Sequence, residues 1–184
     1  MIIGIDPSLT CTGLAFVKVQ GGKLFYKLET IKPPHTRVKG DKLAEAEELL
    51  TRMSVITRGI RKKLKYAMSK FHTSPRGVFI ELPWQYKLRY GKTNTKSLMK
   101  LSLLVGAVVD VFDMLGYRPS GIPSGGGIPK KQAGYDFLRA LGFNFKPNRG
   151  FDNSDALIVA IFGGWYYGRL QKDIQGLTKV EIGV

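Results

Sequence analysis

Cysteine and histidine are scarce in this 184-residue sequence, which has one cysteine, Cys11, and two histidines, His35 and His72. A single cysteine excludes an internal disulfide and fits a reducing compartment. We therefore expect the protein in the cytoplasm, or in that of the host if the source is viral. Neither histidine lies in a motif and Cys11 has no evident base beside it, which argues against a zinc site or a Cys/His nucleophile.

Long apolar runs are also lacking. None approaches the ~20 residues that a membrane span needs, and the opening residues MIIGID lack the basic region and long apolar core of a secretory signal. We therefore expect no membrane partner. Hydrophobic residues still make up 43% of the chain, enough for a packed core. The length predicts one compact domain over residues 1–184, in which the pattern leaves the tail 171–184 uncertain.

Acidic residues are few. Asp and Glu total 14 against 29 Lys and Arg, which gives a net charge of +15 and a pI near 10.0. Such an excess favours a polyanionic partner, nucleic acid first. The basic residues are dispersed over several segments, which suits a broad binding surface better than a tail. Solubility, or adaptation to an acidic environment, remains the alternative.

The hydrophobic periodicity predicts an α/β protein. Strands are expected at 1–5, 14–19, 24–31, 78–81 and 118–122, and helices at 42–71, 97–115, 130–141 and 155–170. Gly21-Gly22 is expected to form a hairpin turn. Leu43, Leu50 and Ile60 are among the residues expected on the apolar face of the first helix. This order predicts a central mixed five-stranded sheet flanked by helices.

Four acidic residues stand where acids are least expected. Asp6 and Glu81 each directly follow an apolar strand, and Asp152 and Asp155 share one face at the start of the last helix. A carboxylate at the end of a buried strand is costly unless it is paired or holds a cation. If the helix packs across neighbouring strands, the four carboxylates converge, and clustered hard oxygen ligands suit Mg²⁺ or Mn²⁺. Two such ions about 4 Å apart can activate water and stabilise the leaving oxygen of a phosphodiester.

Each acid also has a simpler explanation. Asp6 could cap a turn, Glu81 could be an ordinary residue at a strand edge, and Asp152 with Asp155 could form a variant of the capping box. Together these explanations require three independent coincidences in the right chain order.

Three segments resemble the motifs of RuvC-type Holliday-junction resolvases, which belong to the RNase H-like superfamily. They are IGIDPSLTCTG at 3–13, FIE at 79–81 and DNSDAL at 152–157. The resemblance implies an RNase H-like fold and a Mg²⁺-dependent endodeoxyribonuclease that makes symmetric nicks in four-way DNA junctions. It also implies that Asp6 lies between two Mg²⁺ ions, for which Mn²⁺ substitutes, and that Glu81, Asp152 and Asp155 complete their coordination.

The first motif has a rival. An aspartate followed by Thr-Gly near a first strand also occurs in the phosphate loop of actin-like and sugar-kinase ATPases. Those proteins are about twice as long and have a second nucleotide-binding lobe, for which this chain has no room. We therefore expect no nucleotide cofactor.

The segment after Glu81 interleaves aromatic and basic side chains, which suits stacking on unpaired bases and contacts to phosphates. We predict DNA contacts at Trp84, Tyr86, Lys87, Arg89, Tyr90, Lys92, Lys96, Lys100 and Lys130. By the resemblance, Trp84 stacks into the junction centre. The alternatives are that Trp84 anchors the loop in the core and that Lys96 and Lys100 lie on a solvated helix face.

The resemblance also implies a homodimer and a catalytic lysine. The helix at 97–115 is apolar nearly all round, which fits either a dimer interface or core burial alone. We predict Lys131 as the lysine that assists near the scissile phosphate, although the glycines at 125–127 leave open whether Lys130 or Lys131 reaches the site. Two other classes stay open, namely another RNase H-like nuclease (an RNase H or a transposase-like enzyme) and a non-catalytic DNA-binding protein of the same fold.

Overall fold

The fold is built on one mixed sheet. The computed structural model describes residues 1–34, 41–83, 95–123, 128–171 and 173–183. Its strands are β1 (Ile2–Asp6), β2 (Thr12–Gln20), β3 (Lys23–Ile31), β4 (Gly77–Leu82), β5 (Ser120–Pro123) and β6 (Thr178–Glu181). They lie in the order β5-β4-β1-β2-β3-β6. β1, β2 and β3 are antiparallel neighbours, whereas β4, β5 and β6 pair in parallel with β1, β4 and β3.

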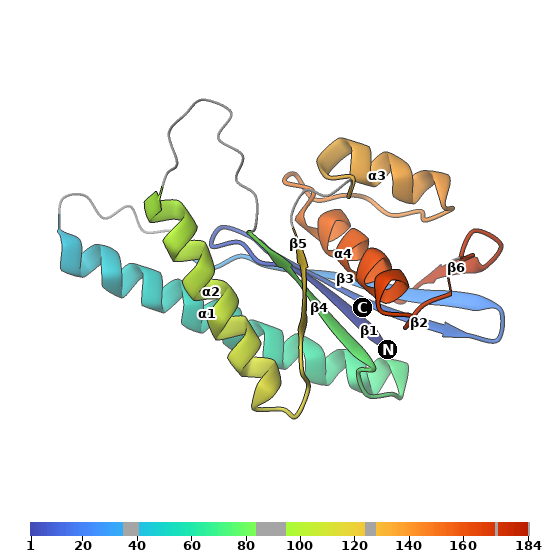
Figure 1. Ribbon diagram of the computed structural model, residues 1–184, viewed down its shortest axis with the longest axis horizontal. Helices are drawn as coiled ribbons and strands as arrows, with labels where there is room; N and C mark the ends of the chain where they lie inside the picture. Colours follow the sequence, from blue (N-terminus) through green and yellow to red (C-terminus); the bar gives the residue numbers. More distant parts are fainter. Residues whose placement is uncertain (35–40, 84–94, 124–127, 172, 184) are drawn as a thin grey trace.

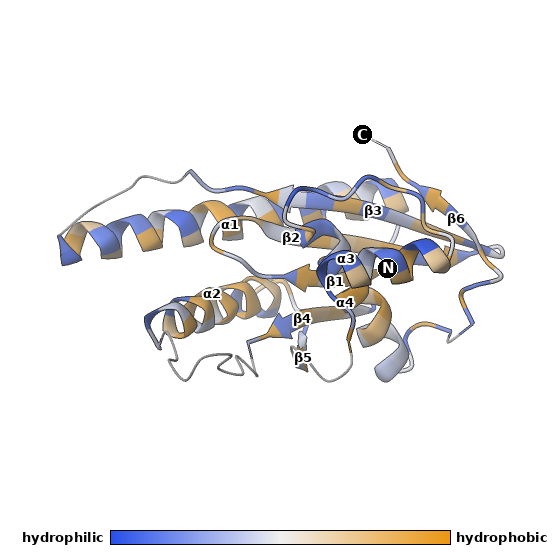
Figure 2. Ribbon diagram, turned by 90° about the horizontal axis from the view of Figure 1, so that it is seen from above, coloured by the Kyte–Doolittle hydropathy of each residue, from blue (hydrophilic) through white to orange (hydrophobic). Residues whose placement is uncertain are grey.

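Helices cover both faces of this sheet (Figure 1). They are α1 (Lys42–Phe71), α2 (Thr95–Asp113), α3 (Lys131–Ala140) and α4 (Asp152–Tyr166). Alternate residues of β1 point to opposite faces, so Ile3 and Ile5 pack with α1 and α2, while Ile2 packs with α4. α4 is hydrophobic over most of its length (Figure 2), as expected of a helix buried against a sheet.

The α/β class and the mixed sheet are confirmed, but the number of strands is wrong. The structure has six strands because residues 178–181, in the tail left uncertain, pair with β3. Thr178–Glu181 carries no apolar alternation and is half-buried to exposed at the sheet edge. Its pairing is therefore set by the neighbouring strand rather than by its own sequence pattern.

The hairpin and the first helix are confirmed with their expected bounds. Gly21 and Gly22 have φ of 57° and 70° and connect the paired residues Gln20 and Lys23, as a type I′ turn requires. α1 covers 42–71, but Leu43 and Leu50 are 68% and 64% exposed instead of buried. Figures 1 and 2 show why, because the first half of α1 extends beyond the edge of the sheet together with the start of α2.

The last helix begins earlier than the periodicity indicates, at Asp152 rather than Asp155, and it ends at Tyr166. Both carboxylates therefore lie inside its first turn. Within the described residues, we find no helix that combines the length and the apolar character needed to cross a bilayer.

Candidate active site

The first two carboxylates stand side by side at the ends of adjoining strands. β1 and β4 are parallel, and Ile5 pairs with Ile80. The next residue is therefore Asp6 on β1 and Glu81 on β4. Asp6 is half-buried, and Glu81 is 9% exposed. The parallel register thus brings together two acids that are 75 positions apart in the sequence.

Two glycines allow α4 to approach the sheet closely enough to add the other two carboxylates. A Cβ on Gly4 would lie 2.2 Å from the carbonyl oxygen of Ala156, and a Cβ on Gly13 would lie 1.9 Å from that of Asp152. No real side chain fits at such distances. The first turn of α4 therefore lies directly over β1 and β2, with Asp152 half-buried and Asp155 1% exposed.

The electrostatics of Asp6 show that the acids share one environment. Burial, which is the largest effect, and the negative charges of Asp155 and Asp152 raise the pKa of Asp6 to about 7, against the opposing effect of Lys130 and Lys131. A carboxyl group with this pKa is poised to lose its proton when a cation approaches. The structure thus brings Asp6 close to Asp152 and Asp155, the two acids at the start of α4.

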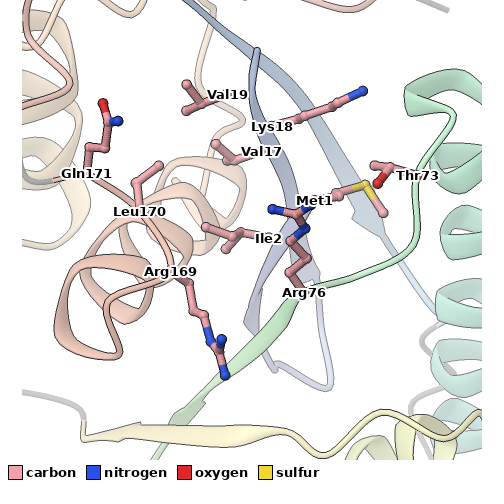
Figure 3. Close-up of a pocket in the computed structure, with 10 residues that line it drawn as sticks. All are labelled: Met1, Ile2, Val17, Lys18, Val19, Thr73, Arg76, Arg169, Leu170 and Gln171. Carbon is pink, nitrogen blue, oxygen red and sulfur yellow. The ribbon is translucent and has the colours of Figure 1, made fainter.

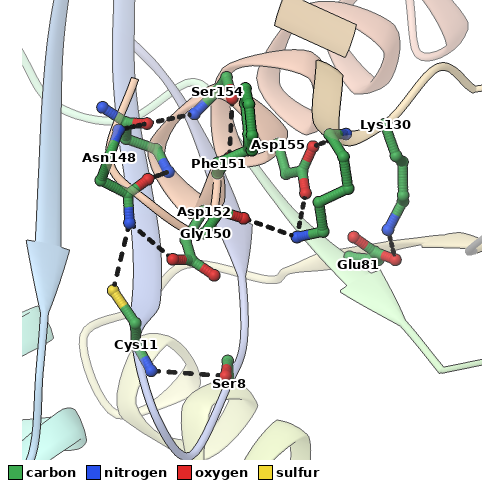
Figure 4. Close-up of polar contacts among 12 residues, drawn as sticks. Ser8, Cys11, Glu81, Lys130, Asn148, Gly150, Phe151, Asp152, Ser154 and Asp155 are labelled. Atoms are coloured by element: carbon green, nitrogen blue, oxygen red, sulfur yellow. Dashed lines mark hydrogen bonds and ion pairs between the residues drawn. The ribbon is translucent and has the colours of Figure 1, made fainter. Parts of the chain in front are cut away.

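Both lysines at the start of α3, Lys130 and Lys131, reach this site. The Lys130 ammonium group forms an ion pair with Glu81 Oε1 (Figure 4). Lys131 Nζ lies 2.6 Å from Asp155 Oδ2, and its backbone N–H donates to Asp155 Oδ1 at 2.9 Å. The sequence left open whether Lys130 or Lys131 reaches the site. In the structure both lysines do, and each contacts a different carboxylate.

The backbone around these contacts adopts an uncommon conformation. Lys131 and Phe151, which directly precedes Asp152, have φ of 55° and 61°. Non-glycine residues rarely adopt the left-handed region, and such residues are enriched at functional sites. In this structure, they place the Lys131 N–H on Asp155 and start α4 at Asp152.

Asn148 is a site residue that the sequence analysis missed. Its side-chain amide donates to Asp152 Oδ2 at 2.6 Å and to Cys11 Sγ at 3.6 Å (Figure 4). Asn148 and Asn153 also bond reciprocally, each backbone N–H donating to the other's side-chain oxygen at 3.1 and 3.2 Å. An asparagine just before a helix is a common loop-capping residue, which is the only signal that the sequence offered.

The donor set fits a hard divalent cation. Glu81 Oε2 is buried without a hydrogen-bond partner in the described part of the chain, and there Asp155 Oδ2 has only its ion pair with Lys131. Buried carboxylate oxygens left in this way are stabilised by a cation. As the side chains lie, with lysines against Glu81 and Asp155, no three acids, histidines or cysteines of the described ranges are close enough together to hold one ion. Metal binding at Asp6, Glu81, Asp152 and Asp155 would therefore require the two ammonium groups to move aside.

Most of the residues predicted to contact DNA lie outside the part of the chain that the structure describes. Trp84, Tyr86, Lys87, Arg89, Tyr90 and Lys92 lie in the segment 84–94, outside the described residues. Lys96 and Lys100 stand on the first turns of α2, where Lys96 is paired with Glu45 of α1 and Lys100 is half-buried. Both remain predictions as DNA contacts.

Comparison with known proteins identifies the fold. No family model matches the sequence, and no curated protein matches it. The structure is similar to that of T. thermophilus RuvC in complex with a Holliday-junction substrate, with a TM-score of 0.59 and 20% sequence identity over 91% of this chain and 93% of that one. The chain therefore has the RNase H-like fold in its RuvC form, as the sequence motifs predicted.

Proposed function

We propose that this protein is a metal-dependent endonuclease that cuts four-way DNA junctions. The observation that carries the proposal is the convergence of Asp6, Glu81, Asp152 and Asp155 at one end of the sheet, with a buried oxygen of Glu81 left unpartnered within the described residues. The structurally similar RuvC is described with a Holliday junction as its substrate. The net charge of +15 supports a nucleic-acid substrate.

The chain's own residues supply binding, orientation and charge. A pair of divalent ions, when bound, would activate water and stabilise the leaving oxygen. Asp6, Glu81, Asp152 and Asp155 would hold these ions, and Asn148 keeps one oxygen of Asp152 in place. Once displaced from Glu81 and Asp155, Lys130 and Lys131 would present their ammonium groups to the phosphate beside the carboxylates. We infer that Lys131 has the catalytic role and that Lys130 binds DNA, with Mg²⁺ as the natural ion and Mn²⁺ as a substitute.

We further infer a homodimer through α2, which would place two such sites to cut two symmetric strands. The buried face of α2 packs on the sheet through Leu104, Val108 and Val111. Beside this face, Met99 and Leu103 are 59% and 51% exposed at a spacing of four, so they form an apolar strip on one side of the helix.

Cleavage of an end-labelled synthetic four-way junction tests the function. The reaction is run with Mg²⁺ and with EDTA, for wild type, Asp6→Asn and Asp173→Asn, an exposed acid in the segment after α4. A linear duplex and an RNA–DNA hybrid are run in parallel. We expect paired, symmetric nicks on the junction that disappear with EDTA and with Asp6→Asn but remain with Asp173→Asn.

Other outcomes point to other classes. Cutting of the hybrid would favour an RNase H, and cutting of the linear duplex would favour a transposase-like enzyme. Tight junction binding without cutting in either metal would favour a non-catalytic binding protein of the same fold. Each of these results would overturn the resolvase proposal.

A further inference from the structure

A cavity with a partly polar lining lies at the opposite end of β1 from the carboxylates. It encloses about 300 Å³ between the start of β1, the end of β2, the connection from α1 to β4 and the segment after α4 (Figure 3). Ile2 lines the cavity, whereas Asp6 ends the same strand. Four residues of a strand span about 13 Å, so this cavity is separate from the candidate active site.

The charged lining of this cavity has one sign. Lys18, Arg76 and Arg169 line it, and no acidic residue does. Neither guanidinium group has a hydrogen-bond or ion-pair partner among the residues that the structure describes, whereas Lys18 Nζ is held at 2.9 Å by the carbonyl oxygen of Phe71. Figure 3 shows the charged ends of the three side chains pointing in different directions around the cavity, so they do not form a closed cluster, but positive charge without an acidic residue in the lining favours an anion there.

The segments that carry the two arginines are fixed by backbone hydrogen bonds. Arg76 N–H donates to the carbonyl oxygen of Met1 at 2.7 Å, and Arg169 N–H donates to that of Gly164 at 2.7 Å. They also adjoin each other, because a Cβ on Gly77 would lie 3.6 Å from Arg169 Cγ. The side chains of both arginines are exposed, but these hydrogen bonds hold the backbone that carries them in place.

The Met1 amine lies within reach of the same positive charges. Burial, which is the largest effect, and the charges of Arg76 and Lys18 together lower its pKa to about 6. Met1, Lys18 and Arg76 all line this cavity (Figure 3).

The remaining lining suits an organic group attached to the anion. Ile2, Val17 and Leu170 form an apolar floor, and Thr73 and Gln171 add polar side chains at the rim. A volume of about 300 Å³ is at the lower end of the range for small-molecule sites, roughly 300–1,000 Å³. Guanidinium groups offer paired N–H donors that match phosphate oxygens.

We propose that this cavity binds the phosphate group of a nucleotide or of a nucleic-acid strand, with the exposed side chains of Arg76 and Arg169 turning onto the phosphate and Lys18 adding positive charge at the rim. The sugar or base then lies on the apolar floor. The site is independent of the carboxylates, so it serves to recognise a nucleotide or to hold a second stretch of strand and takes no part in cleavage.

The test is a titration of the ¹⁵N-labelled full chain in EDTA, followed by NMR at the amides of Lys18, Thr73, Gly77 and Gln171. The probes are dTMP, thymidine and the oligonucleotide (dT)₁₀, at constant ionic strength. We expect saturable shifts with dTMP, with (dT)₁₀ or with both, and none with thymidine, which lacks the phosphate. Saturation by dTMP identifies a free nucleotide as sufficient, whereas a response to (dT)₁₀ alone identifies a strand phosphate.

The control compares two double variants with the same loss of charge. Arg76→Gln with Arg169→Gln is expected to weaken binding at least tenfold. Arg58→Gln with Lys62→Gln, on the exposed side of α1, is expected to leave it unchanged. Equal shifts with thymidine, no response to any probe, or equal affinity in the two double variants would overturn the proposal.

This result is separable from the proposed function. Arg76→Gln with Arg169→Gln leaves all four carboxylates in place, so junction cleavage should persist at the wild-type rate with a junction concentration that saturates the enzyme. Loss of phosphate binding with cleavage intact supports the proposed pocket. Cleavage that falls in proportion to phosphate binding would show that the two sites are not independent and would overturn that part of the proposal.

Discussion

The side-chain amide of Asn148 lies 2.6 Å from Asp152 Oδ2, which ties the loop before α4 to a carboxylate of the candidate active site. The hydrogen bond occupies one oxygen of Asp152 and fixes the rotation of its carboxylate. Partners of this kind orient metal ligands, and their removal typically costs about 10–100-fold in metal affinity.

Asn148→Ala should therefore weaken divalent-ion binding by about tenfold or more. The measurement is Tb³⁺ luminescence with Mg²⁺ competition, which reads the ion directly and needs no cleavage. Asn144→Ala is the matched control, because the Asn144 side chain is exposed and, among the described residues, hydrogen bonds with Arg139 and not with a carboxylate of the site. Equal Mg²⁺ affinity in wild type and Asn148→Ala would show that Asn148 only closes the loop.

Gly13→Ala should destabilise the protein by about 2 kcal/mol or more, as expected for overpacking against backbone. The added Cβ would lie 1.9 Å from the carbonyl oxygen of Asp152, so α4 has to move away from β2. Urea unfolding measures the change. Gly106→Ala, at an exposed and open position of α2, should instead stabilise by about 0.5–1 kcal/mol. A loss of stability for both variants would indicate a general intolerance of larger residues rather than close packing at Gly13.

Asp6 should make the metal-free protein less stable as the pH rises from about 4 to about 7. Its pKa is raised from 3.8 to about 7 in the folded state, so the folded chain binds a proton in this window that the unfolded chain has released. Stability falls with pH wherever the folded state binds more protons. In EDTA, the free energy of unfolding of wild type minus that of Asp6→Asn should therefore decrease over this window. A flat difference would mean that Asp6 is ionised throughout.

Lys131→Met should make the stability of the protein more dependent on Mg²⁺. Lys131 Nζ neutralises Asp155, which is 1% exposed, and loss of the partner leaves a buried carboxylate without its cation. We expect a lower melting temperature than wild type in EDTA and a larger increase on addition of Mg²⁺, measured by differential scanning fluorimetry. Lys146→Met, at an exposed position, should respond to Mg²⁺ as wild type does. An unchanged Mg²⁺ response in Lys131→Met would show that its ammonium group does not occupy the cation position.

Leu103→Glu should weaken the proposed dimer without unfolding the monomer, because Leu103 is 51% exposed and a charge at an apolar interface must be desolvated. Sedimentation velocity over a concentration series reads the association directly. Ser102→Glu places the same charge at the exposed neighbouring position of α2 and should change association less. A monomeric wild type at all concentrations would exclude the dimer.

The sequence by itself determined the α/β class, the bounds of α1, the hairpin at Gly21-Gly22 and the candidate acids. These features are local, since periodicity and turn chemistry act over a few residues, and an acid after an apolar strand is visible without tertiary contacts. Where the signal was weak, prediction failed. Thr178–Glu181 becomes a strand only through pairing with β3, and Leu43 and Leu50 are exposed because the sheet does not extend beneath them.

Only the tertiary structure decided how the site is assembled. The parallel register of β1 and β4 sets Asp6 beside Glu81, and the missing side chains of Gly4 and Gly13 let α4 bring Asp152 and Asp155 over them. Lys130, Lys131 and Asn148 contact these acids across long sequence separations or around a loop. Such contacts depend on packing distances of a few ångströms between elements, which a one-dimensional pattern of residue types does not encode.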